Sequence, residues 1–371
     1  MKSESSANKS TNFGRVVDWI RDNVWILAAV AGVCVFLGFL APLISAKTVI
    51  STFENDSWTF SHGDRTDINC SILFGVGTTI VWPLTIAYSL IVGGIACALF
   101  GKRFPRFLTA SMILYIVGGI FVLLSSQFYD YANCLSLVGG QAFWDWIKDY
   151  SSNSSSRLGV GSILAAVIAF VAGLLSFSAA FEEEKTSVRD MTEIAILSAS
   201  AIIIDVIFHY FPHIEGQFGS ISLATLPLFF IALRHGPTKG FLASGIVFGL
   251  ITCFTDGYGF FLYPLDYLVG FGSCAVLGFF QPFILNEKVK TYNVKGEIFI
   301  FVGVLLAAIV RFVGSTASSI INYGLDLGTA LIGNSIYIPI SAGLSAIVLM
   351  AIYGPLINLN KYFKTRSIKV E

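Results

Sequence analysis

A single acidic residue, Asp266, stands inside the apolar segment FLYPLDYLVGFGSC (260–273), which is long enough to lie in a lipid bilayer. A charge within the hydrocarbon layer is costly unless it faces a cavity or a partner, so it marks a candidate functional site. Further polar side chains flank the two apolar runs that follow: Arg311 and Ser315 end the first run, and Asn334 opens the second. If these segments cross the membrane in alternating directions, their polar residues lie at one depth.

These side chains predict a polar pocket that opens outward and takes a small flat or cationic ligand. Tyr323, in the connection between the last two runs, supplies an aromatic face, and the outer loop at 209–222 can close over the same end. A second interpretation is that Asp266 and Arg311 neutralise each other between helices and serve packing alone. The number of polar groups at this depth favours the pocket.

The composition is that of a membrane protein. Of the 371 residues, 55% are hydrophobic and 12% are charged, and the mean hydropathy is +0.76, which no ordinary water-soluble domain shows. Because a helix needs about 20 apolar residues to cross a bilayer, we predict an all-α polytopic membrane protein with about ten transmembrane helices. The expected spans are 24–44, 74–100, 107–126, 158–181, 192–209, 220–233, 240–255, 260–284, 297–315 and 331–353.

The placement of positive charge predicts the orientation. Most of the 23 Lys and Arg residues fall in segments that lie on one side of the membrane if the N-terminus is inside. Since positively charged loops stay in the cytoplasm, this bias predicts an even number of spans and two cytoplasmic termini.

The polar connector EEEKTSVRD divides the chain. We expect five parts: a cytoplasmic N-terminus (1–23), a four-span module (24–181), the connector (182–190), a six-span module (191–355) and a basic cytoplasmic tail (356–371). The function of the four-span module is not predicted. Its two long outer loops hold Cys70 and Cys134, which can form a disulfide.

Enzyme chemistry finds little support in the sequence. The segment GGIACALFGKRF resembles a phosphate-binding loop, but Ala96 stands where the first glycine belongs and Arg103 replaces the Ser or Thr that meets magnesium. There is no metal-ligand spacing and no Ser/His/Asp order. We therefore expect no enzyme activity, no cofactor and no nucleic-acid partner.

Ala195 and Ala199 are four residues apart in the first span of the second module, TEIAILSASAIII. Small residues at this spacing let another helix approach closely. The approaching helix can belong to the same bundle or to a partner, and spacing alone leaves both open.

With these residues in view, residues 187–355 resemble the thiamine-binding S component of the energy-coupling factor (ECF) transporters. The resemblance rests on three stretches: VRDMTEIAILSASAII, GSISLATLPLFFIALRHGPTKGFLASGIVFGL and LDYLVGFGSCAVLGFF. It implies a six-helix bundle in a bacterial cell membrane that captures a vitamin from outside. It also implies docking on a transmembrane coupling protein, with two cytoplasmic ATPase subunits that use the ATP.

The resemblance also implies roles for individual residues. Asp266 matches the acidic ligand of the aminopyrimidine ring, Tyr267 the tyrosine after it, and Asn334 a ligand-binding asparagine. Phe218 stands about where a lid aromatic is expected. Ala195 and Ala199 match the surface that meets the coupling protein.

The sequence departs from the family in the pocket. Ser315, Ser319 and Tyr323 replace a His, a Gly and a Trp, and Gly333 and Thr329 replace two tyrosines. Loss of aromatic faces leaves room for a thiamine relative, such as a pyrimidine or another small cyclic cation. We therefore expect the substrate-binding subunit of a vitamin uptake transporter. The alternatives are a membrane sensor or adaptor and a self-contained secondary carrier.

Overall fold

The computed structural model describes residues 19, 23–54, 57–68, 70–71, 75–76, 79–80, 82–104, 106–126, 129, 157–183, 187–209, 219–257, 262–285, 292–323 and 325–362. The chain forms two compact units, whose boundary in the helical part of the sequence falls between Glu182 and Glu183. Unit 1 holds the described residues up to Glu182, and unit 2 holds those from Glu183 onward.

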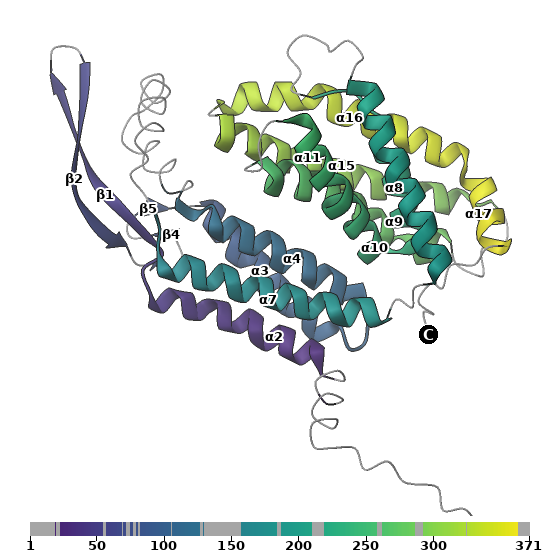
Figure 1. The fold of residues 1–371 in the computed structure, drawn as a ribbon, viewed down its shortest axis with the longest axis horizontal. Helices are drawn as coiled ribbons and strands as arrows, with labels where there is room; N and C mark the ends of the chain where they lie inside the picture. The colour runs from purple at the N-terminus through teal and green to yellow at the C-terminus, as the bar shows by residue number, and fades with distance from the viewer. Residues whose placement is uncertain are drawn as a thin grey trace, which may run out of the picture. The chain divides into compact units, whose positions relative to one another are not determined.

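The described residues of unit 1 form four helical segments that run side by side (Figure 1). They are α2 (Val24–Cys34), continued by the 3₁₀ segment η1 (Val35–Leu40), α3 (Trp82–Phe100), α4 (Arg106–Leu123) and α7 (Val160–Glu183). Small residues bring these helices together, because a Cβ atom at Gly94 would lie 2.8 Å from Tyr115 Cε1. The buried Tyr115 donates its hydroxyl to the Ala28 carbonyl oxygen at 3.1 Å, so the interior of unit 1 is closely packed.

A β-hairpin follows the first helix of unit 1. Strands β1 (Ile44–Glu54) and β2 (Ser57–Ile68) pair antiparallel (Figure 1). Strand β6 (Arg157–Leu158) pairs with the other edge of β1. Three two-residue strands form a second sheet: β3 (Cys70–Ser71), β4 (Gly75–Val76) and β5 (Thr79–Ile80). The hairpin adds strands where an external loop was expected, because β-branched and aromatic residues flank a polar turn.

The described residues of unit 2 up to Ala351 form six helical passages. Their elements are α8 (Val188–His209), α9 (Thr225–His235), α10 (Pro237–Phe241), η2 (Leu242–Phe248), α11 (Gly249–Asp256), η4 (Tyr263–Val269), α12 (Gly270–Gly272), η5 (Ser273–Ala275), α13 (Val276–Phe279), α14 (Gln281–Ile284), α15 (Val294–Tyr323) and α16 (Leu327–Ala351). The run from α10 to α11 is one passage, and the run from η4 to α14 is another.

The helices have the length and composition of membrane spans. Among the described residues, six helices are long and apolar enough to cross a bilayer: Arg106–Leu123, Val160–Ala180, Val188–Phe208, Pro237–Asp256, Val294–Tyr323 and Leu327–Ala351. Three shorter apolar helices are Val24–Leu40, Leu84–Phe100 and Thr225–His235. With the segmented passage from η4 to α14, these elements confirm the predicted all-α polytopic membrane protein.

Several helix ends differ from the prediction. The span expected at 74–100 begins with strands β4 and β5 and becomes helical only at Trp82, where α3 starts. Helix α15 continues to Tyr323, so Tyr323 lies in its last turn rather than in a loop. Asn322 Nδ2 donates to Ser318 Oγ one turn earlier at 2.9 Å. After α16, helix α17 (Tyr353–Tyr362) occupies part of the expected tail. Hydropathy ends the predicted span 297–315 early because polar side chains that bond within a helix lower the average without ending the helix.

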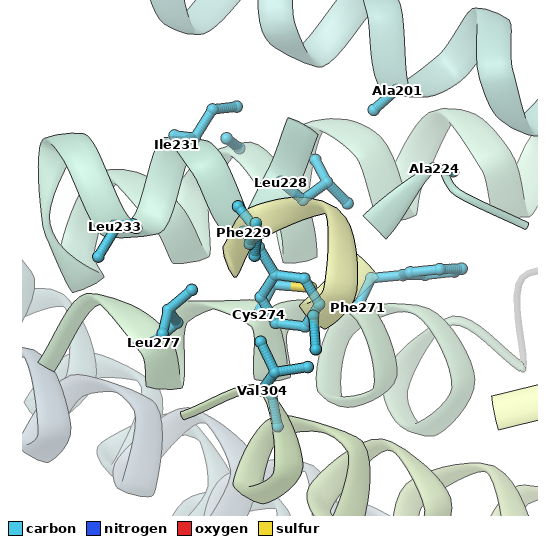
Figure 2. Packing of buried hydrophobic residues seen from close by; sticks show 14 of the residues in the cluster. Ala201, Ala224, Leu228, Phe229, Ile231, Leu233, Phe271, Cys274, Leu277 and Val304 are labelled. Atoms are coloured by element: carbon cyan, nitrogen blue, oxygen red, sulfur yellow. The ribbon is translucent and has the colours of Figure 1, made fainter. Parts of the chain in front are cut away.

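The short helix α9 lies in the hydrophobic core of unit 2. Its side chains Leu228, Phe229 and Ile231 are buried beside Phe271 and Cys274 of the segmented passage (Figure 2). Close packing of this kind fixes side-chain positions. The passages that carry the candidate site are therefore held by a common core.

Candidate functional site

Asp266 lies on the π-helical segment η4. A π-helical turn holds one more residue than an α-helical turn, and such segments occur frequently at functional sites. The Tyr263 hydroxyl of the same segment donates to the Gly245 carbonyl oxygen at 3.1 Å, and Gly245 belongs to the second π-helical segment, η2. Two widened helical segments thus pack together next to Asp266.

The Asp266 carboxyl group faces helix α15. It interacts electrostatically with Ser315 and Ser318 of this helix, whose side chains are buried. Gly314 permits this approach, since a Cβ atom there would lie 3.0 Å from the Leu265 carbonyl oxygen. Asp266 therefore interacts with polar groups of a neighbouring helix of the bundle.

Arg311 stands one turn before Ser315 on α15. Its guanidinium carbon lies 4.3 Å from the ring centroid of Phe271 and 5.8 Å from that of Tyr337. The guanidinium group therefore makes cation–π contacts with both rings. Arg311 also attracts Asp266 electrostatically, yet within the described part of the chain no ion pair within 4 Å joins them. Asp266 and Arg311 therefore do not neutralise each other through a direct ion pair.

Tyr267, the residue after Asp266, is 5% exposed and donates its hydroxyl to Asp256 Oδ2 at 2.8 Å. Asp256 is the last residue of α11, and Gly257 after it has φ 73°, a left-handed conformation that suits glycine. Sequence reasoning missed Asp256. An acidic side chain at the C-terminal end of a helix interacts unfavourably with the helix dipole. This unfavourable position was the sequence signal that could have identified Asp256 as a site residue.

Asn334 is buried on α16 and connects three residues. Its Nδ2 group donates to Ser319 Oγ at 3.1 Å and to the Ala330 carbonyl oxygen at 2.9 Å, and its Oδ1 atom accepts from the Tyr337 hydroxyl at 3.1 Å. Tyr337 was also missed, although it lies three residues after Asn334 and hence on the same helix face. The structure thus brings Asn334, Ser319 and Tyr337 together.

The remaining predicted site residues divide into two groups. Tyr323 lies at the end of α15 with 51% of its surface exposed, above the buried Ser319. Phe218 and Cys134 lie outside the described residues, and the Cys70 side chain does too. The lid aromatic and the disulfide therefore stay predictions.

Ala195 and Ala199 are exposed on α8. This helix is the least covered of the candidate spans, with 11% of an 18-residue stretch buried, against 33% to 61% for the other five. Apolar residues on its open side include Ile196 and Ile203, 61% and 59% exposed. Within unit 2, the two alanines therefore do not serve internal packing.

A small cavity of about 10 Å³ adjoins Arg311, between Thr225, Ser273 and Cys274. This volume suits about one water molecule. A larger groove of about 420 Å³ runs between α15 and α16, and its lining, which includes Phe301, carries no charge. A ligand at Asp266 therefore needs more space than the small cavity offers. The polar pocket predicted from the sequence stays a prediction.

Comparison with known proteins gives concordant matches for unit 2. Residues 191–362 match the family model described as thiamine transporter protein. The thiamine transporter ThiT of Bacillus subtilis (strain 168) is 30% identical over 148 residues, which cover 38% of this chain and 74% of the relative. The helices of unit 1 lie outside the residues that the family model matches.

Proposed function

This chain belongs to the thiamine transporter family, and from that membership we propose that its six-span module is the substrate-binding subunit of an ECF-type uptake transporter. The ligand is thiamine or a thiamine-related solute, such as a pyrimidine or a small cyclic cation, captured from outside. We assign the module to residues 191–355, after the four-span module (24–181) and the connector (182–190). The protein lies in the bacterial cell membrane with both termini in the cytoplasm.

The observation that carries this proposal is the position of Asp266. An ionisable residue within a membrane bundle that faces polar groups marks a binding path or site. Its carboxylate accepts hydrogen bonds from a ring amine of the ligand, and Tyr267 covers the ring. Asn334 adds amide hydrogen bonds once it exchanges Tyr337 or Ser319 for the ligand. Arg311 receives a hydroxyl or anionic group.

The remaining pocket residues give the ligand its enclosure. Ser315 and Ser319 are short hydroxyl side chains where bulkier ones would fill the space, and Tyr323 and Phe218 supply aromatic faces near the entrance. The site binds and releases the solute, with no bond made or broken.

Transport requires partners under this proposal. The surface around Ala195 and Ala199 on α8 meets the transmembrane coupling protein, because small residues on an uncovered helix permit close helix contact. Two cytoplasmic ATPase subunits supply the energy. The open side of α8 supports this assignment.

Calorimetric titration of the purified full chain in lipid nanodiscs with thiamine tests the proposal. We expect saturable binding that Asp266→Asn weakens by about 10- to 100-fold, since a hydrogen bond to a charged group contributes about 1.5–3 kcal/mol. Asp326→Asn, outside the site, serves as the control. Equal affinity of Asp266→Asn and the wild type contradicts the proposed site. Concentrative uptake by the isolated chain in liposomes would indicate a secondary carrier instead.

A further inference from the structure

The turn between α3 and α4 in unit 1 combines positive and aromatic side chains. Three cations alternate with three phenylalanines in the segment FGKRFPRF: Lys102, Arg103 and Arg106 among Phe100, Phe104 and Phe107. The turn directly joins two apolar helices of 19 and 18 residues. Because helices of this length and composition end near the edge of the hydrocarbon layer, the turn lies at the membrane–water interface.

The backbone of this turn is held in one conformation. The N–H groups of Arg103 and Phe104 both donate to the Phe100 carbonyl oxygen at 3.1 Å, and the Gly101 N–H donates to the Ala98 carbonyl oxygen at 3.0 Å. Gly101 is buried, and a Cβ atom there would lie 2.5 Å from Leu108 Cδ2. The cations and rings are therefore presented by an ordered, tightly packed turn.

Lys102 and Arg103 are both exposed. Lys102 Nζ lies 5.6 Å from the ring centroid of Trp25 on α2, and the guanidinium carbon of Arg103 lies 5.7 Å from that of Phe104. Within the described part of the chain, no ion pair within 4 Å joins either cation to an acid. A ring contact orients a cation without supplying a negative charge, so both side chains remain able to bind an anion.

The phenylalanine rings form a cluster beside these cations. Phe100, Phe104 and Phe107 are 59%, 50% and 42% exposed. The ring centroid of Phe107 lies 6.2 Å from that of Phe100 and 5.9 Å from that of Phe104. Exposed apolar side chains that gather in this way indicate an interaction surface, and aromatic rings are favourable at the boundary between lipid headgroups and acyl chains.

We propose that the α3–α4 turn is a binding surface for anionic phospholipids. Lys102 and Arg103 bind the headgroup phosphate, and the three phenylalanine rings pack against the upper part of the acyl chains. The expected orientation places this turn at the cytoplasmic leaflet, whose surface is negatively charged. A zwitterionic headgroup fits less well, because its ammonium group repels the two cations. This inference concerns unit 1 and does not depend on the proposed function of unit 2.

The test is native mass spectrometry of the full chain in detergent, titrated with phosphatidylglycerol or with phosphatidylcholine of the same acyl chains. We expect the wild type to bind phosphatidylglycerol more tightly. Lys102→Gln and Arg103→Gln should each weaken phosphatidylglycerol binding about fivefold and change phosphatidylcholine binding less than twofold. Lys295→Gln is the matched control, because it removes one exposed positive charge at the start of another apolar helix, α15. It should leave both affinities within twofold.

Two further measurements separate the parts of the surface. Phe104→Ala should weaken both lipids by a similar factor, since it removes a ring and no charge. Inorganic phosphate, compared with chloride at equal ionic strength, should not displace phosphatidylglycerol from the wild type. The inference is overturned if the wild type shows no preference between the two lipids, if Lys102→Gln and Arg103→Gln keep it, or if Lys295→Gln reduces it equally. Displacement by inorganic phosphate would also overturn it, because the surface would then bind free phosphate.

Discussion

The guanidinium group of Arg234 and the carboxylate of Glu193 form an ion pair that joins α9 to α8. The Arg234 side chain is 1% exposed, and the Glu193 side chain is 22% exposed. His235 Nε2 lies 3.5 Å from the same carboxylate oxygen. Because α8 is otherwise the least buried span, this pair is a principal attachment of its first turns to the bundle.

Removal of the Glu193 charge is therefore expected to destabilise unit 2. In Glu193→Gln the buried Arg234 loses this ion pair, and breaking a buried pair in this way costs about 3 kcal/mol. Thermal unfolding of the purified protein in detergent measures the effect as a lowered midpoint. Lys295→Gln, at an exposed position on α15, is the matched control. An unchanged midpoint for Glu193→Gln would show that the pair contributes nothing.

The surface of α8 gives a second prediction. A Trp side chain at Ala195 prevents close approach of another helix, so Ala195→Trp should abolish co-purification of a coupling protein and two ATPase subunits from the native host. Thiamine binding should stay intact, since Ala195 is an exposed residue of α8 and Asp266 belongs to η4. Ile207→Trp, also on an exposed position but near the other end of α8, should retain the partners. Loss of association in both variants would argue against a specific contact at the alanines.

Ser319 positions Asn334, which gives a third prediction. Without the Ser319 hydroxyl, one amide hydrogen of Asn334 loses its partner, and its side chain is less well oriented for a ligand. Ser319→Ala should weaken thiamine binding about fivefold, consistent with a loss of about 1 kcal/mol for one neutral hydrogen bond. Ser335→Ala provides the comparison, because the exposed Ser335 hydroxyl bonds only the Ile332 carbonyl oxygen of its own helix. Similar affinities for both variants would exclude a positioning role.

Hydropathy was sufficient to predict the helical passages, because the bilayer imposes length and apolar content on each. It also identified Asp266 and Arg311, since charges in apolar runs stand out. It did not predict the β1–β2 hairpin, because hydropathy measures apolar length and not the alternation of β-branched and aromatic residues that indicates strands. Nor did it predict the π-helical geometry of η4, a segment that packs against α15 and η2.

The missed site residues have a common cause. Asp256 and Tyr337 occupy positions that look like a helix end and a lipid-facing aromatic in the sequence. Their roles depend on which residues of other passages stand opposite, namely Tyr267 and Asn334. The linear sequence does not show which residues of different passages lie opposite each other. An isolated charge in an apolar run, by contrast, can be recognised directly.

The start of α16 gives a final prediction, which concerns pH. Asp326 is the N-cap of α16, and its Oδ2 atom accepts a hydrogen bond from the Thr329 backbone N–H at 2.9 Å. Hydrogen bonds from the Thr329 side chain and backbone lower the pKa of Asp326 below its usual value. Since the folded state holds this acid in its charged form, the stabilisation is complete above the unfolded pKa of about 3.9 and disappears as the pH falls through the folded value.

Asp326→Ala should therefore lower the unfolding temperature at pH 7, and the difference from the wild type should shrink at pH 3. Asp326→Asn is the informative control, because Asn is also a good N-cap but carries no charge. Its unfolding temperature should lie close to that of the wild type at low pH, and any deficit should appear only at higher pH. A constant difference between wild type and Asp326→Ala from pH 3 to pH 7 would show that the charged form of the cap contributes no stability.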